Sequence, residues 1–137
     1  MIPLLLGILF GFLALLHIYW ALGGTLGFEK SIPVQPDGNP LFRPGPAVTL
    51  LVAAILLMIA AYFLGGWALM HDFRNLWSVP GWMIGIAFLL RSMGEFKYVG
   101  FFKKVRGSDF ARMDTFIYSP LCLLISGVTI QHLIFLR

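Results

Sequence analysis

The segment from Pro46 to Met70 contains 25 consecutive residues without a charged side chain. The hydrocarbon core of a bilayer is about 30 Å thick, and about 20 apolar residues span it as a helix. A small soluble domain cannot bury this much apolar surface. The composition agrees, because 59% of the 137 residues are hydrophobic and 12% are charged, against about 25% charged in soluble domains. An integral membrane protein is therefore predicted, and a soluble or disordered chain is excluded.

Four segments are predicted to cross the membrane, forming one all-α transmembrane domain over residues 1–137 with the fold of a four-helix bundle. Their predicted ranges are about 2–22, 46–70, 77–96 and 115–136. The third is the weakest, because its apolar part, Leu76–Leu90, has only 15 residues, about 22 Å of helix. Continuing this helix past Leu90 makes it long enough and brings Arg91 and Glu95 to the hydrocarbon boundary.

The basic residues are distributed unevenly between the predicted connections. Eight of the ten follow the first and third segments, and only Arg74 and Arg137 lie on the other side. Basic loops face the cytoplasm. We therefore predict a multi-pass protein of the cell inner (plasma) membrane with cytoplasmic long loops and both termini extracytoplasmic.

The connection from Tyr98 to Arg112 combines aromatic residues with Lys103, Lys104 and Arg106. Such a segment is typical of the membrane interface, where each basic residue gains about 1 kcal/mol from anionic lipid. The three basic residues are therefore predicted to bind anionic lipid headgroups. The alternative is that they only determine the orientation of the chain.

Polar side chains are predicted to converge at the cytoplasmic half of the bundle. A charge at membrane depth costs several kcal/mol unless it is paired, extends to the interface or lines a cavity, and a buried imidazole needs a hydrogen-bond partner. One hypothesis is a polar pocket for a small or lipid-like ligand, in which the histidine exchanges protons. The alternative is a self-satisfied histidine and solvated or mutually paired charges at a helix end. The candidate ligand-binding residues are His17, Tyr19, Trp20, Arg91, Glu95, Asp114, Tyr118 and Ser119.

The sequence lacks the spacings that would specify a known chemistry. It has no HExxH motif, no paired Cys/His motif, no phosphate-binding glycine loop and no dinucleotide fingerprint. No metal, cofactor or nucleic acid is therefore predicted. Cys122 is the single cysteine, which excludes an intrachain disulfide. Whether the pocket is catalytic stays open.

Two small-residue patterns, Gly7-xxx-Gly11 and Gly81-xxx-Gly85, permit close approach of helices. They favour packing within the chain, with a homo-oligomer as the alternative. An alternative function follows from them, a non-catalytic accessory or partner subunit. A minimal transporter is a third possibility, disfavoured because the first segment lacks an acidic residue and the charge bias resists insertion in both directions.

Four groups of residues resemble a known family, and the resemblance covers nearly the whole chain. They are His17, Tyr19 and Trp20 with Gly23 and Gly24, then Arg91 with Gly94 and Glu95, then Val99–Lys103, and finally Asp114 with Tyr118–Cys122. The chain resembles a family of small bacterial four-span membrane proteins, the domain-of-unknown-function family three-nine-nine-five. This resemblance implies a bacterial integral membrane protein. It implies no activity and no catalytic residues.

Overall fold

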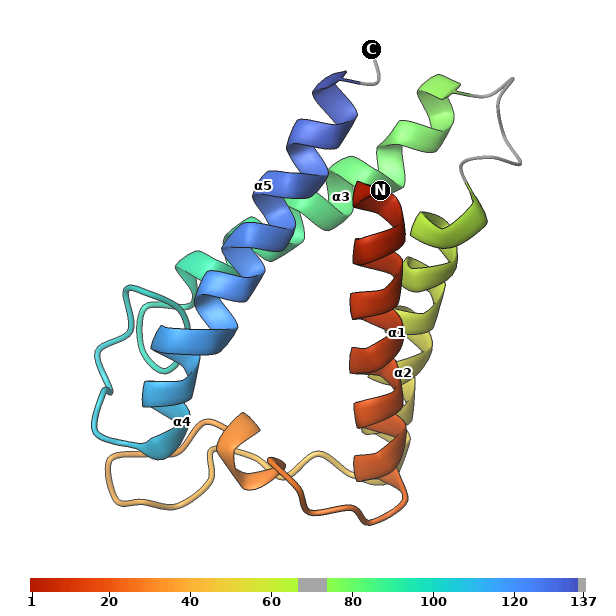
Figure 1. Ribbon diagram of the computed structural model, residues 1–137. Helices are drawn as coiled ribbons and strands as arrows, with labels where there is room; N and C mark the ends of the chain where they lie inside the picture. The colour runs from red at the N-terminus through yellow and green to blue at the C-terminus, as the bar shows by residue number, and fades with distance from the viewer. Residues whose placement is uncertain (67–73, 136–137) are drawn as a thin grey trace. The chain divides into compact units, whose positions relative to one another are not determined.

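The computed structural model describes residues 1–66 and 74–135, which divide into two compact units. Unit 1 consists of Met1–Leu26 and Pro44–Ser78, and unit 2 consists of Gly27–Arg43 and Val79–Arg137. Helices and loops make up the described residues (Figure 1), so the predicted all-α class is confirmed there. The packing of all helices into one bundle and the side of the membrane on which the termini lie stay predictions.

Unit 1 is built on an antiparallel pair of helices, α1 (Ile2–Ala21) and α2 (Pro46–Ala61), coloured red and yellow-green in Figure 1. Each helix has a proline in its first turn. The N–H groups of a first turn have no acceptor within the helix, so a proline there costs no hydrogen bond. The helix of α2 continues as a wider π-helical turn, η2 (Tyr62–Gly66). The buried positions of α2 and η2 recur every three or four residues, the spacing of a helix–helix seam. They are Thr49, Ala53, Leu56, Ala60 and Phe63, and α1 contributes Leu6, Gly7, Phe10 and Ala14.

Gly7 brings α1 close to the end of α2. A Cβ atom at Gly7 would lie 2.5 Å from Leu64 Cγ and 3.3 Å from the Ala60 carbonyl oxygen. Near this contact the rings of Phe10 and Phe63 stack with their centroids 5.9 Å apart. Gly11 differs, because a Cβ there meets nothing within 4 Å. Of the first glycine pattern, Gly7 therefore serves packing within the chain.

Unit 2 contains the larger part of α3 (Arg74–Met93) and one continuous helical segment. That segment consists of α4 (Asp109–Met113), the π-helical turn η4 (Asp114–Tyr118) and α5 (Ser119–Phe135). The helices α3 and α5 meet at Gly85, whose carbonyl oxygen accepts a hydrogen bond of 2.7 Å from Ser126 Oγ. A Cβ at Gly85 would lie 2.8 Å from Ile130 Cγ1. The second glycine pattern thus also serves packing within the chain at this position.

Three described segments are long and apolar enough to cross a membrane, which indicates a multi-pass membrane protein. They are Ile2–Ala21, Pro46–Gly65 and Asp109–Phe135, and the apolar helix Ser78–Met93 is shorter. α3 begins at Arg74 and ends at Met93, whereas 77–96 was predicted. The last segment begins at Asp109 instead of at 115, because Ser108 caps the helix by accepting a hydrogen bond from the Ala111 N–H. The predicted ends at 70 and 136 lie outside the described residues.

The first long connection folds into a short hairpin within unit 2, after the turn η1 (Glu29–Ser31). Its two arms are joined by hydrogen bonds from Gln35 N to Asn39 O (2.8 Å) and from Leu41 N to Pro33 O (2.7 Å), with an isolated bridge between Val34 and Pro40. Gly38 adopts φ +86°, as a turn followed by a glycine bulge requires. At its tip, hydrogen bonds from the Asn39 side chain and backbone hold the pKa of the exposed Asp37 carboxyl below its usual value.

The contrast between Gly7 and Gly11 gives a test of the packing in unit 1. Replacing Gly7 by Leu should lower the free energy of unfolding by about 1–3 kcal/mol, because Leu64 and the Ala60 carbonyl leave no room. Replacing Gly11 by Leu on the same helix should change it little. Reversible unfolding in detergent measures both, and equal losses for the two variants would contradict the packing described.

Candidate functional site

The C-terminal end of α3 is set by Gly94. Its N–H donates to the Leu90 carbonyl at 2.8 Å, and its φ of +82° turns the chain out of the helix. A Cβ at Gly94 would overlap the carbonyl of Val99, so the returning loop packs directly on this glycine. The Phe101 N–H then bonds to the Ser92 carbonyl at 2.9 Å. The loop after α3 is therefore folded back onto the helix that it leaves.

A buried carboxylate, Asp114, holds this loop to the last helix. Its Oδ1 accepts a hydrogen bond from Arg91 Nη2 at 3.1 Å. Its Oδ2 accepts one from the Gly100 N–H at 2.7 Å and one from Lys103 Nζ at 3.0 Å. The Asp114 side chain is fully buried and that of Lys103 is 1% exposed. Three donors, two of them cationic, thus compensate the cost of burying one carboxylate.

All three ammonium donors of Lys103 are used inside unit 2. Besides Asp114, they reach the Gly100 carbonyl at 3.0 Å and Thr115 Oγ1 at 2.6 Å. An ammonium group has no further donor. The predicted contact of Lys103 with lipid headgroups therefore does not fit its position, because the side chain turns inward to the only carboxylate it contacts in the described part of the chain. Lys104 and Arg106, the other two residues of that prediction, are exposed.

Arg91 is the cation of this cluster that keeps unused donors. Its guanidinium bonds to Asp114 through Nη2, and its side chain is 37% exposed. Among the described residues, Nη1 of Arg91 is buried and has no hydrogen-bond partner. Since Lys103 and Arg91 share one carboxylate, the three charges sum to +1. The cluster therefore lacks one negative charge.

The turn η4 places Asp114 and Ser119 at its two ends. The Ser119 N–H bonds to the Asp114 carbonyl, five residues back, in place of the usual four. Pro120 follows directly and has no N–H to donate to the carbonyl of Phe116, so the ordinary bonding pattern cannot continue there. Ser119 is fully buried, and its hydroxyl has no partner within the described part of the chain.

Glu95 and Tyr118, two other predicted residues of unit 2, form no hydrogen bond with this cluster in the described part of the chain. Glu95 lies beyond the end of α3 and is exposed, so it does not share a helix face with Arg91. Tyr118 is directed to the first connection, where its hydroxyl donates to the Lys30 carbonyl at 3.3 Å. Its ring lies near that of Phe110, with centroids 6.2 Å apart.

His17, Tyr19 and Trp20 belong to unit 1, and their interactions are local. His17 Nδ1 donates to the Leu13 carbonyl at 2.7 Å, and its ring meets that of Trp20 edge-on at 4.9 Å. The indole N–H of Trp20 reaches the Leu26 carbonyl at 2.8 Å. Tyr19 is 44% exposed. These contacts agree with a self-satisfied histidine, and a meeting of these residues with Arg91 stays a prediction.

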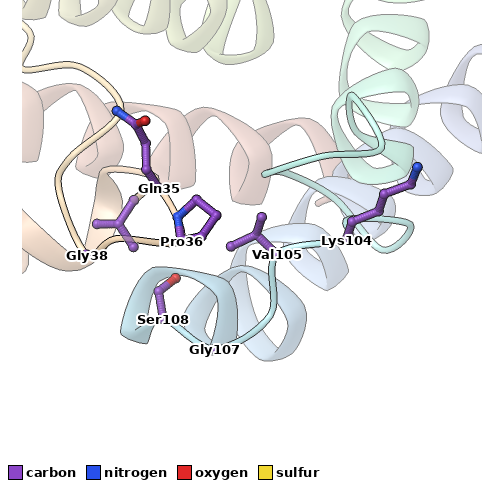
Figure 2. Close-up of a pocket in the computed structure, with 8 residues that line it drawn as sticks. Gln35, Pro36, Gly38, Lys104, Val105, Gly107 and Ser108 are labelled. Carbon is purple, nitrogen blue, oxygen red and sulfur yellow. The ribbon is translucent and has the colours of Figure 1, made fainter.

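A pocket of about 510 Å³ lies elsewhere in unit 2, where the hairpin meets the segment before α4 (Figure 2). Pro36 and Val105 face each other in this view, and the Lys104 side chain extends away from them. The pocket therefore has little charge to recognise a ligand. Its lining consists of Val34, Gln35, Pro36, Gly38, Lys104, Val105, Gly107 and Ser108.

A comparison with known protein families finds a match over most of the chain. The model of one family, described as a protein of unknown function (DUF3995), matches residues 10–129. The chain belongs to the DUF3995 family. No curated protein and no solved structure matches it.

Lys103, Gly100 and Thr115 belong to the cluster, but the sequence did not predict them as residues of the ligand pocket. Lys103 stands beside Lys104, and nothing in the sequence distinguishes the buried lysine from the exposed one. The signal that was available was Gly94, because a glycine after the last apolar turn is typical of a helix end. It would have removed Glu95 from the helix and left Asp114 as the acidic partner of Arg91.

Asp114 should be among the residues on which stability depends most. Replacing it by Asn leaves Lys103 and Arg91 without a counter-charge and should lower the free energy of unfolding by about 3–5 kcal/mol. Asp109→Asn, an exposed acid five residues earlier, should change it little. The double variant Lys103→Met with Asp114→Asn should lose less than the sum of the single variants. Denaturant unfolding in detergent measures all four, and additive losses would contradict the pairing.

Proposed function

We propose that this DUF3995 protein is a multi-pass protein of the bacterial inner membrane that binds a small or lipid-like ligand at the Arg91 end of unit 2. The observation that carries the proposal is the charge of the Asp114 cluster. Two cations share one carboxylate, and the Nη1 group of Arg91 has no partner in the described part of the chain. A buried cation without a counter-charge is costly. An anionic group on the ligand would supply the missing charge.

The chemistry of Arg91 favours an oxyanion as the group that is bound. A guanidinium presents its N–H donors in a planar fork that matches a carboxylate or a phosphate. Because 37% of the side chain is exposed, a ligand can approach from outside the cluster. Lys103 is a positioning residue, since its three donors are already used. Ser119 stays a candidate of the proposal, because its buried hydroxyl has no partner in the described chain.

The orientation belongs to the same proposal. The distribution of Lys and Arg supports a cytoplasmic location of the basic connections, where Lys104 and Arg106 would meet anionic headgroups. In a chain whose Cys122 is replaced by Ser, Asp37→Cys in the first connection should react with an impermeant maleimide only from the cytoplasmic side. Ile2→Cys at the start of α1 should react only from outside. Labelling of intact spheroplasts and inverted vesicles gives both results, and the reverse pattern would overturn the orientation.

Ligand binding can be tested with short-chain amphiphiles as probes. Dihexanoyl phosphatidic acid and octanoate, but not dihexanoyl phosphatidylcholine, should raise the melting temperature of the detergent-solubilised protein. Saturation at 100 times Kd corresponds to about 2.7 kcal/mol of added stability. Arg91→Gln should abolish the effect. Arg91→Lys, which keeps the charge but not the planar fork, should raise Kd at least about tenfold.

The control for this experiment is Lys104→Gln, which removes an exposed cation outside the cluster and should leave the probe affinity unchanged. An unchanged response of the Arg91 variants would overturn the proposed site. So would the absence of any response of the unmodified protein to both anionic probes.

A further inference from the structure

The loop between α3 and α4, residues 94–108, exposes two phenylalanine rings beside each other. Phe96 is 56% exposed and Phe102 is 59% exposed, and their ring centroids lie 6.2 Å apart. Burial of aromatic rings is a major source of stability in proteins. This pair is nevertheless held at the surface of unit 2, away from the buried cluster around Asp114.

The backbone of the loop fixes this pair in place. The Lys97 carbonyl accepts hydrogen bonds from the N–H groups of Lys104 (3.1 Å) and Val105 (3.0 Å), so the two halves of the loop lie side by side. Phe96 adopts φ +66°, which is unfavourable for a bulky residue and persists only where the surroundings impose it. The exposed rings are therefore presented by an ordered loop.

Lys103 determines which of its neighbours face outward. Its side chain is buried against Asp114, while Phe102 and Lys104 on either side are exposed. Lys97 is also exposed and is brought beside Lys104 by the backbone hydrogen bond. The loop thus presents two aromatic rings together with two lysines. We call Phe96, Phe102, Lys97 and Lys104 the aromatic–lysine patch.

This combination fits the boundary between headgroups and acyl chains of an anionic membrane. Aromatic and aliphatic groups insert to a depth of about 5–10 Å at that boundary, while basic groups bind the phosphates. The loop is joined at one end to α3 and at the other to the membrane-spanning segment Asp109–Phe135. Its attachment and its charge both favour a bilayer surface over a soluble partner.

We infer that the aromatic–lysine patch inserts Phe96 and Phe102 into the headgroup–acyl boundary of an anionic leaflet, with Lys97 and Lys104 on lipid phosphates. The inference goes beyond headgroup contact by basic residues, because it assigns the apolar part of the contact and an ordered loop that presents it. It is independent of a ligand at Arg91.

The depth of the rings can be measured by quenching. Phe96→Cys and Phe102→Cys, each in a chain with Cys122→Ser, are labelled with a nitrobenzoxadiazole fluorophore in nanodiscs. With lipids brominated at acyl carbons 6 and 7 and containing phosphatidylglycerol, both labels should be quenched at least about twofold and should shift to shorter wavelength. A label on Asp37→Cys, exposed in the first connection and outside the patch, should instead be quenched by aqueous iodide. Iodide quenching at 96 and 102 equal to that at 37 would overturn the insertion.

The role of charge has its own control. In phosphatidylcholine alone, or after Lys97→Glu with Lys104→Glu, quenching by brominated lipid should fall at least about twofold. Unchanged quenching would overturn the contribution of the lysines. Arg91→Gln should leave the quenching unaltered, which separates the patch from the ligand site. Because both phenylalanines are exposed, their replacement should not change the melting temperature, and this identifies labelled chains that are folded.

Discussion

The carboxylate of Asp114 is the interaction on which the fold of unit 2 depends. It joins the last helical segment to Arg91 at the end of α3 and to two residues of the following loop, the N–H of Gly100 and the ammonium group of Lys103. A carboxylate buried without donors would be strongly destabilising. Paired with two cations, it becomes the point around which the loop folds. The helix α3 therefore ends at a charge cluster that the last helical segment completes.

The backbone makes that cluster possible as much as the charges do. Gly94 and Gly100 both adopt positive φ, and a Cβ on either would overlap the backbone of the other's segment. This close approach turns the Gly100 N–H to within 2.7 Å of Asp114. The widened turn η4 sets the position of Asp114 on its own helix, next to a proline that cannot continue the ordinary bonding pattern. Each local irregularity thus serves the same contact.

The sequence was sufficient for the class of fold, because uncharged segments of about 20 residues have few stable states outside a membrane. It also indicated a polar region near Arg91, since the apolar part of the third segment is short. The sequence was insufficient to predict which charged residues form pairs. Glu95 was placed on the helix because a longer helix was needed to cross the membrane, and the positive φ of Gly94 ended that helix first. The contact of Lys103 with Asp114 joins residues eleven positions apart through a loop, and no periodic pattern encodes such a contact.

The two cations around Asp114 have different roles. One role concerns the aromatic–lysine patch, and the other concerns the proposed ligand site at Arg91. Lys103 is saturated, so it can only hold the loop, and by turning inward it leaves Phe102 and Lys104 outside. Arg91 is held by the same carboxylate but retains donors for a further anion. Loss of the carboxylate would release both the loop and the guanidinium. A change at Lys104, in contrast, acts on the aromatic–lysine patch, and a change at Arg91 acts on the ligand site. In the described chain Lys104 bonds to Lys97 and Arg91 bonds to Asp114, so the two residues share no partner.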